Sequence, residues 1–152
     1  MSIEARIAEL GLTLPEPAKP VASYVSYVRS GNQVTISGQL SNDANGGIKG
    51  TVGVDVTPEQ ALEAARLCGL NLIAQIKAAC NGDLDRVVRI VKLGGFVQAG
   101  PDFTAIPAVI NGCSDMMVEV FGEAGKHARS AVGVYKLPLG FAVEIDAIVE
   151  IR

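Results

Sequence analysis

The sequence predicts an α+β domain, a two-layer sandwich in which two helices cover one face of a mixed sheet of about six strands. Three observations lead to this prediction. Two long segments repeat apolar residues at helical spacing, strand-like apolar segments alternate with them, and hairpin signals occur near both ends of the chain. A chain of 152 residues fits one domain that can fold without disulfides or metals.

The chain is expected to begin with a short helix and an extended connector. Residues 2–10 place Ile3, Ile7 and Leu10 on one face of an amphipathic helix. Three prolines within residues 14–20 exclude both helix and strand, so this segment is predicted to be an extended connector.

Two strands are predicted next, at residues 22–29 and 33–37. The Gly31-Asn32 turn between them favours a hairpin. Residues 42–53 are rich in turn residues, and one further short strand is expected in this region.

The longest helix is predicted to begin at Thr57 and to end near Cys80. Thr57 is a suitable N-cap, Pro58 fits the first helical position, and Gln60 completes a capping box. Asn81-Gly82 is a typical helix stop.

The second half of the chain continues the alternation of strands and helices. Residues 85–97 predict a strand, 106–121 a second long helix, and 130–135 and 143–151 the last two strands, which a Leu-Pro-Leu-Gly turn separates. The apolar residues of 85–97 are so continuous that both faces of this strand are expected to be covered. Two helices cover only one face of the sheet, so a partner subunit is expected on the other.

The composition also favours an oligomer and excludes several kinds of site. Charged residues make up 19% of the chain, below the roughly 25% of typical soluble domains. The net charge is -3 and no basic run occurs, so no nucleic-acid partner is expected. Neither a signal peptide nor a membrane span is expected.

The three cysteines, Cys68, Cys80 and Cys113, form no zinc motif, and the only histidine is His127. We therefore expect no metal, no cofactor and a reduced, cytoplasmic protein.

The C-terminal part carries a specific motif. It consists of Arg129-Ser130-x-Val132-x-Val134-x-x-Leu137-Pro138, followed by Val143-Glu144-Ile145-Asp146-Ala147-Ile148. This pattern resembles the signature of the RidA family, also called YjgF or L-PSP. Upstream, Tyr24-Val25, Gly31-Asn32 and Ser37-Gly38-Gln39 match the family's first strand pair in order and spacing, and Asn111 matches an asparagine near the start of its second helix. The resemblance makes residues 21–152 a RidA-like domain and residues 1–20 an added N-terminal extension.

The resemblance implies a chorismate-mutase-like fold and a homotrimer with an inner barrel formed by the three sheets. It also implies a ligand cleft at each subunit interface. The activity that it implies is hydrolysis of small 2-imino and 2-enamino acids to 2-keto acids and ammonia.

Arg129 and Glu144 are the expected catalytic residues. The resemblance implies that Arg129 binds the substrate carboxylate, for which a planar guanidinium fork is well suited. It places Glu144 near the attacking water, where a carboxylate can guide protons. Alternatively, Arg129 pairs with an acid such as Glu144 on the neighbouring strand, or Glu144 lies on a solvated strand face or forms a salt bridge across the trimer interface.

Tyr24, Ser37, Gly38, Asn111 and Ser130 are the expected substrate-binding residues. Tyr24 would line the cleft from a neighbouring subunit, although Tyr27 could take that role or Tyr24 could simply pack in a strand. Ser37-Gly38 would expose main-chain groups to the ligand. Asn111 could instead cap a helix.

The sequence departs from the family pattern at two positions. Ala131 stands where many members have a cysteine, which argues against redox control by a thiol there. His127 stands where a proline is frequent, and Asp146 has no evident role.

Three functional hypotheses follow from the sequence: an imine deaminase, a non-catalytic trimer that binds keto acids, and a ribonuclease. The acidic composition disfavours the ribonuclease.

Overall fold

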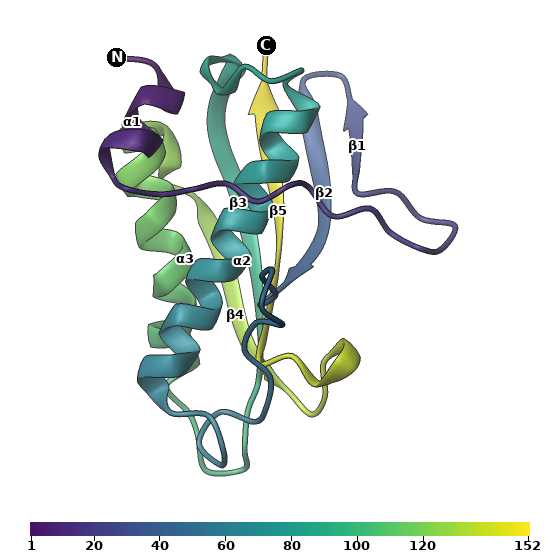
Figure 1. The fold of residues 1–152 in the computed structure, drawn as a ribbon, viewed down its shortest axis with the longest axis vertical. Helices are drawn as coiled ribbons and strands as arrows, with labels where there is room; N and C mark the ends of the chain where they lie inside the picture. The colour runs from purple at the N-terminus through teal and green to yellow at the C-terminus, as the bar shows by residue number, and fades with distance from the viewer.

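The computed structural model describes all residues, 1–152, as one α+β unit (Figure 1). Its elements, in chain order, are α1 (Ile3–Glu9), β1 (Tyr27–Ser30), β2 (Gln33–Leu40), α2 (Pro58–Ala79), η1 (Leu84–Arg86), β3 (Val87–Gln98), α3 (Ile106–Phe121), η2 (Gly122–Gly125), β4 (Ala128–Val134), η3 (Pro138–Gly140) and β5 (Val143–Ile151). None of the helices combines the length and the apolar character that crossing a membrane requires.

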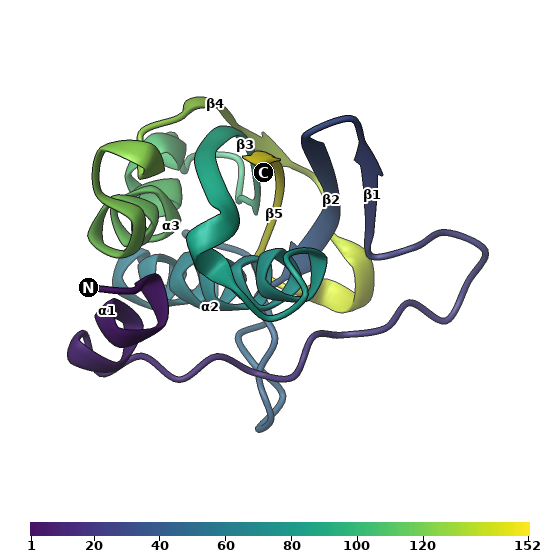
Figure 2. The same cartoon turned by 90° about the horizontal axis from the view of Figure 1, so that it is seen from above.

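The five strands form one mixed sheet in the order β1-β2-β5-β3-β4. Only the β3–β4 pair is parallel, and α3 is the crossover between these two strands. Helices α2 and α3 both lie against the same face of the sheet, and no helix covers the other face (Figure 2). The expected architecture of two helices on one face of a mixed sheet is therefore confirmed.

The predicted caps of α2 are present. The Thr57 side chain accepts the Gln60 N–H at 3.1 Å, and the Gln60 side chain accepts the Thr57 N–H at 2.9 Å. Pro58 follows at the first helical position, and the chain leaves the helix through Asn81 at a φ of 53°. The periodic apolar face of α2 is fully buried against β5, β2 and α3.

Small residues let α2 and α3 approach each other closely. A Cβ added to Gly112 would lie against the Leu62 carbonyl oxygen and 3.1 Å from the Ala65 Cβ. On the facing helix, a Cβ on Gly69 would lie 2.9 Å from the Met116 sulfur. Gly112 lies inside α3, where close packing against α2 requires a residue without a side chain.

The sheet has five strands and not the expected six. Residues 42–53 contribute only isolated bridges, in which Lys49 pairs with Phe141 and Val52 pairs with Val56 and Ala99. Glycines with positive φ, among them Gly46 and Gly47, keep this segment irregular.

The first strand is shorter than predicted, since β1 begins only at Tyr27. The β2 strand changes its register between Ile36 and Gln39, and the last backbone contact with the incoming chain is the Ser37 N–H to the Ser26 carbonyl at 2.9 Å. Residues 22–25 make no backbone–backbone hydrogen bond with β2.

The prediction of a C-terminal hairpin is wrong. Strands β4 and β5 are neighbours in sequence, but β3 lies between them and pairs with both. The Leu-Pro-Leu-Gly segment forms η3 within the connection between two strands that do not touch. As a consequence, Arg129 and Glu144 do not lie on paired strands.

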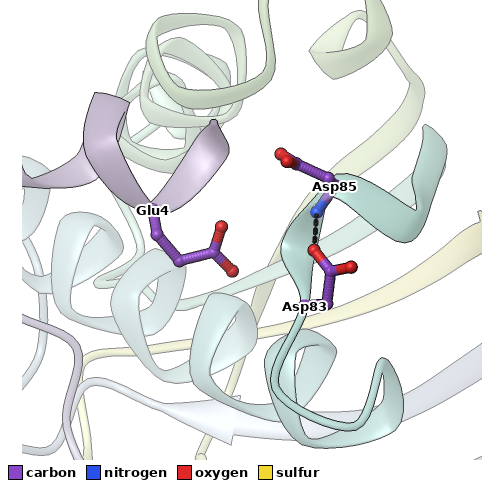
Figure 3. Close-up of side chains that lie close together, drawn as sticks. All are labelled: Glu4, Asp83 and Asp85. Carbon is purple, nitrogen blue, oxygen red and sulfur yellow. Dashed lines mark hydrogen bonds between the residues drawn. The ribbon is translucent and has the colours of Figure 1, made fainter. Parts of the chain in front are cut away.

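Residues 1–20 pack along the helical layer. Ile7 is buried in the main core, and α1 packs against α3. Reciprocal caps connect α1 to η1, since Asp85 accepts the Ile3 N–H at 2.8 Å and Glu4 accepts the Leu84 N–H at 2.7 Å. Glu4, Asp83 and Asp85 form the molecule's one acidic cluster of metal-ligand spacing (Figure 3), and an oxygen of each already accepts a backbone N–H.

Gly112→Ala should lower the free energy of unfolding by about 1–3 kcal/mol, because the added methyl group forces α2 and α3 apart. The measurement is urea denaturation at a fixed protein concentration. The exposed Asp115→Ala on the same helix is the control and should stay within about 0.5 kcal/mol of wild type. Equal stability of both variants would show that the interhelical contact has room for a methyl group.

Candidate functional site

The structure sorts the predicted site residues into two groups, at different places on the chain. Tyr24, Ser37, Gly38 and Glu144 lie toward the β1–β2–β5 side of the sheet. Arg129 and Asn111 lie at the opposite side, where the edge strand β4 meets α3. Ser130 is also on β4, but it points to the other face of the sheet from Arg129.

Arg129 points toward the helical layer. Its strand partner in the ladder is Leu93, which is fully buried under the helices, so residues in this row face α3. Nη1 of Arg129 donates to Asn111 Oδ1 at 2.8 Å and to Ser114 Oγ at 3.1 Å. Nη2 donates to the Pro107 carbonyl at 3.4 Å. All three acceptors belong to α3.

These contacts leave part of the guanidinium available. A guanidinium has five N–H donors, and three of those of Arg129 are engaged. Nε–H and one hydrogen on Nη2 make no hydrogen bond within the chain, and a guanidinium can present Nε and Nη2 together along one edge of its planar fork. This edge matches the two oxygens of a carboxylate. Arg129 takes part in no ion pair, so the proposed pairing with Glu144 is not formed within the chain.

Asn111 lies inside α3, whose N-cap is Ala105, and so it is not a capping residue. Ser114 was not predicted from the sequence. It follows Asn111 by three residues, so both side chains lie on the same face of the helix beside Arg129. That spacing is the signal that could have found it once the arginine had been placed over α3.

Glu144 and Asp146 lie on the face of the sheet that no helix covers. They alternate along β5 with buried residues and are each half-buried between neighbouring strands. Glycines make room for them: a Cβ on Gly38 would lie 2.6 Å from Oε2 of Glu144, and Gly94 pairs directly with Asp146.

The position of these carboxyl groups affects their acidity. Burial raises the pKa of Glu144, and the charge of Asp146 raises it further. Burial also raises the pKa of Asp146, against the opposite effects of a hydrogen bond from the Gly94 backbone and of the Lys92 charge. A carboxyl group whose pKa is raised is better suited to exchange protons near neutral pH.

The N-terminal connector and the β2 bulge border a cleft of about 510 Å³, and Glu144 is not among the residues that line it. Tyr24, Ser37 and Gly38 line it together with five residues of the connector, Pro15, Glu16, Ala18, Lys19 and Pro20. A single carbonyl, that of Ala18, anchors the connector: it accepts from the buried Gln75 amide at 2.8 Å and from the Ser26 hydroxyl at 3.0 Å. Tyr24 is 61% exposed, whereas Tyr27 is half-buried against the core. Of the two tyrosines, Tyr24 is therefore the one that faces the cleft.

The two groups do not meet within one chain. In the sheet, Glu144 lies opposite Phe96 of β3, and Arg129 lies opposite Leu93 of the same strand. Phe96 and Leu93 are three residues apart, which is about 10 Å along the strand. Two strand spacings add about 10 Å across the sheet. The side chains also point to opposite faces. One chain thus carries two separate groups of predicted residues, one around the Arg129 guanidinium and one that includes the half-buried Glu144.

The cysteines offer no reactive thiol. Burial raises the pKa of Cys113 to about 12 and raises that of Cys68 well above its ordinary value. Ala131 stands on β4 in the position where a cysteine was expected, and it is half-buried with its methyl group against the core.

Comparison with known proteins identifies this architecture. The model of the family described as "YjgF/chorismate mutase-like, putative endoribonuclease" matches residues 4–148. The chain therefore belongs to the YjgF/chorismate mutase-like family, and the resemblance to RidA/YjgF proteins is confirmed.

Two curated relatives cover nearly all of the chain. Protein TCP17 of Trypanosoma cruzi is 50% identical over 152 residues, which are 99% of this chain and 94% of the relative. A 2-iminobutanoate/2-iminopropanoate deaminase of Dermatophagoides farinae is 29% identical over 141 residues, which are 93% of this chain and 95% of the relative.

Solved structures agree with the fold. Protein Atu1372 of Agrobacterium tumefaciens is 48% identical with a TM-score of 0.92, over 99% of this chain and 92% of that one. A "putative endoribonuclease" of Shewanella oneidensis is 34% identical with a TM-score of 0.95, over 99% and 100%. E. coli TdcF with bound serine is 26% identical with a TM-score of 0.62, over 92% and 95%.

Asp146→Asn should lower the pKa of Glu144, because it removes the neighbouring negative charge that raises it. The pKa should stay above its ordinary value, since burial is the larger cause and remains. Carbon-13 NMR titration of the side-chain carboxyl groups measures the shift. Glu150→Gln, also on the open face of β5, is the control and should leave the pKa of Glu144 unchanged. An unchanged pKa in Asp146→Asn would mean that the two carboxyl groups do not interact.

Proposed function

We propose that this protein hydrolyses small 2-imino and 2-enamino acids to 2-keto acids and ammonia, at sites that neighbouring subunits of a homotrimer share. The observation that carries the proposal is the held guanidinium of Arg129. Its Nη1 is fixed by Asn111 and Ser114, while Nε and Nη2 keep two parallel donors for a carboxylate.

The carboxylate lies beside the reacting carbon of an imino acid, so a fixed carboxylate places the C=N bond. Water adds to that carbon, and the C=N electron pair moves to nitrogen. Glu144 accepts a proton from the water and returns it to the leaving nitrogen. As the C–N bond of the tetrahedral intermediate breaks, the remaining hydroxyl proton passes to the nitrogen, which gives ammonia and the C=O group of the keto acid. An enamine first takes a proton on carbon to become the imine.

Two features support a shared site in a trimer. The open face of the sheet carries apolar side chains, including Val132, which is 46% exposed, and the partly exposed Phe96 and Ile148. The two groups of predicted residues lie toward opposite sides of the sheet. A ring of three subunits, with the sheets forming an inner barrel, would cover the open faces and join Arg129 of one chain to Glu144 of the next.

The names of the relatives include both activities. The Dermatophagoides farinae relative is named 2-iminobutanoate/2-iminopropanoate deaminase. Other relatives carry the name endoribonuclease. RNA cleavage suits this chain less well, because its net charge is -3 and its single histidine is engaged by Ser114 and by the Gly125 carbonyl.

Arg129→Ala should reduce imino-acid hydrolysis to the uncatalysed rate while the trimer persists, since the only carboxylate-binding fork is removed. Arg129→Lys should keep partial activity, because a point charge lacks the fork. Ammonia release from a freshly generated imino acid measures the rate, and light scattering measures the mass. Arg66→Ala, which removes a surface arginine paired with Glu63, is the control and should match wild type. Hydrolysis by Arg129→Ala at the wild-type rate would refute the site.

The same assay separates the enzyme from a binding module. If wild type binds 2-oxobutanoate through Arg129 but releases ammonia no faster than buffer, the protein is a carboxylate-binding trimer. RNA cleavage that disappears in Arg129→Ala would instead point to the ribonuclease.

Mixed trimers should recover activity from two inactive variants. When Arg129→Ala and Glu144→Gln chains are unfolded together at equal amounts and refolded, about one quarter of the interfaces receive an intact arginine and an intact glutamate. Activity should therefore return to about one quarter of the wild-type value. The variants refolded separately and then mixed are the control. No recovery would place both residues of each site in the same subunit.

A further inference from the structure

A network of hydrogen bonds leads from Arg129 through Ser114 and His127 to the backbone of Gly125. Nη1 of Arg129 lies 3.1 Å from Ser114 Oγ, and Ser114 Oγ lies 2.9 Å from Nε2 of His127. Nδ1 of His127 lies 2.6 Å from the Gly125 carbonyl oxygen. This network uses the only histidine of the chain.

The direction of each hydrogen bond follows from the two ends. A carbonyl oxygen only accepts, so Nδ1 of His127 carries the proton. In a neutral imidazole Nε2 is then an acceptor, and the Ser114 hydroxyl donates to it. The Ser114 oxygen is left to accept from Arg129, which can only donate. Each group in this hydrogen-bond network thus donates or accepts as its chemistry allows.

The Gly125 end of this hydrogen-bond network is fixed by packing against α3. Gly125 is buried, and a Cβ at this position would collide with the Met117 carbonyl and lie 2.9 Å from the Val118 Cα. The backbone of η2 therefore lies directly on α3. The carbonyl that holds His127 is anchored to the same helix that carries Ser114 and Asn111.

We propose that Ser114 and His127 are positioning residues for the carboxylate-binding arginine. They hold Nη1 against α3, so that the Nε–Nη2 edge stays turned outward to the substrate. This inference rests on the proposed function and names two residues that the family signature does not include. Neither residue touches the substrate, and both act through Arg129.

The arrangement predicts a partial effect. Asn111 holds the same nitrogen at 2.8 Å, so loss of Ser114 leaves one of two restraints. Ser114→Ala and His127→Phe should raise KM and the Kd for 2-oxobutanoate about 3- to 10-fold, the value of one hydrogen bond. They should leave kcat within about twofold of wild type, because the reacting atoms keep their partners.

Conservative variants separate positioning from packing. His127→Phe keeps a ring without an acceptor, whereas His127→Gln keeps an oxygen that can accept from Ser114. His127→Gln should therefore restore most of the binding that His127→Phe loses. Lys126→Ala is the control, because it removes an exposed neighbour that pairs only with Glu123, and it should bind like wild type.

A second measurement does not depend on turnover. The side-chain nitrogen NMR signals of Arg129, assigned by their loss in Arg129→Lys, report how firmly the guanidinium is held. In the intact trimer, Ser114→Ala and His127→Phe should speed the hydrogen exchange of these signals severalfold. His127→Gln and Lys126→Ala should leave it unchanged.

The outcomes decide between the two proposals. Faster exchange together with weaker 2-oxobutanoate binding supports the positioning role even if wild type hydrolyses no imino acid, in which case only the proposed function fails. Unchanged hydrogen exchange and unchanged Kd in both Ser114→Ala and His127→Phe overturn the positioning role. Complete loss of kcat in Ser114→Ala with an unchanged Kd also overturns it, since that result would make the serine a nucleophile.

Discussion

The one-sided burial of β5 is the constraint on which the rest of the structure depends. From Val143 to Ile151 every second residue is buried beneath the helices, and the residues between them lie half-buried on the open face. A strand cannot alternate in this way without sending its polar residues to one common surface. Glu144 and Asp146 therefore lose part of their hydration between β2 and β3 while remaining open on one side. The alternation that stabilises the core thus also places an acid of raised pKa on the surface that a neighbouring subunit is proposed to cover.

Much of the fold follows from local patterns. The capping box at Thr57 and the apolar spacing behind it define α2, because a helix start is specified by a few adjacent residues. Strand order is different, since pairing joins segments that are far apart in sequence. The segment Leu137–Gly140 has the composition of a hairpin turn, yet β3 lies between the two strands that it connects. The parallel β3–α3–β4 crossover explains this, because it sends β4 to the outer edge of the sheet and leaves β3 beside β5.

The candidate site was predictable in its residue types and not in its arrangement. The arginine and the glutamate follow from the family signature, whereas their separation depends on strand order and on which face each side chain takes. Ser114 could not be recognised, because the sequence does not show which group a serine within an apolar helix contacts. In the sequence, His127 is only a position at which the family pattern frequently has a proline. The positioning role proposed for it depends on the buried backbone of Gly125, where packing and not sequence similarity fixes the geometry.

The buried thiols have a practical consequence. Cys68, Cys80 and Cys113 are all buried, and the position two residues after Arg129 is Ala131, so no thiol lies beside the arginine on β4. Alkylating reagents and mild oxidants therefore find no thiolate on the native molecule. A single cysteine engineered onto the surface would be the only group that such reagents modify. The native chain is thus ready for site-specific attachment of a fluorophore or spin label without first replacing its own cysteines.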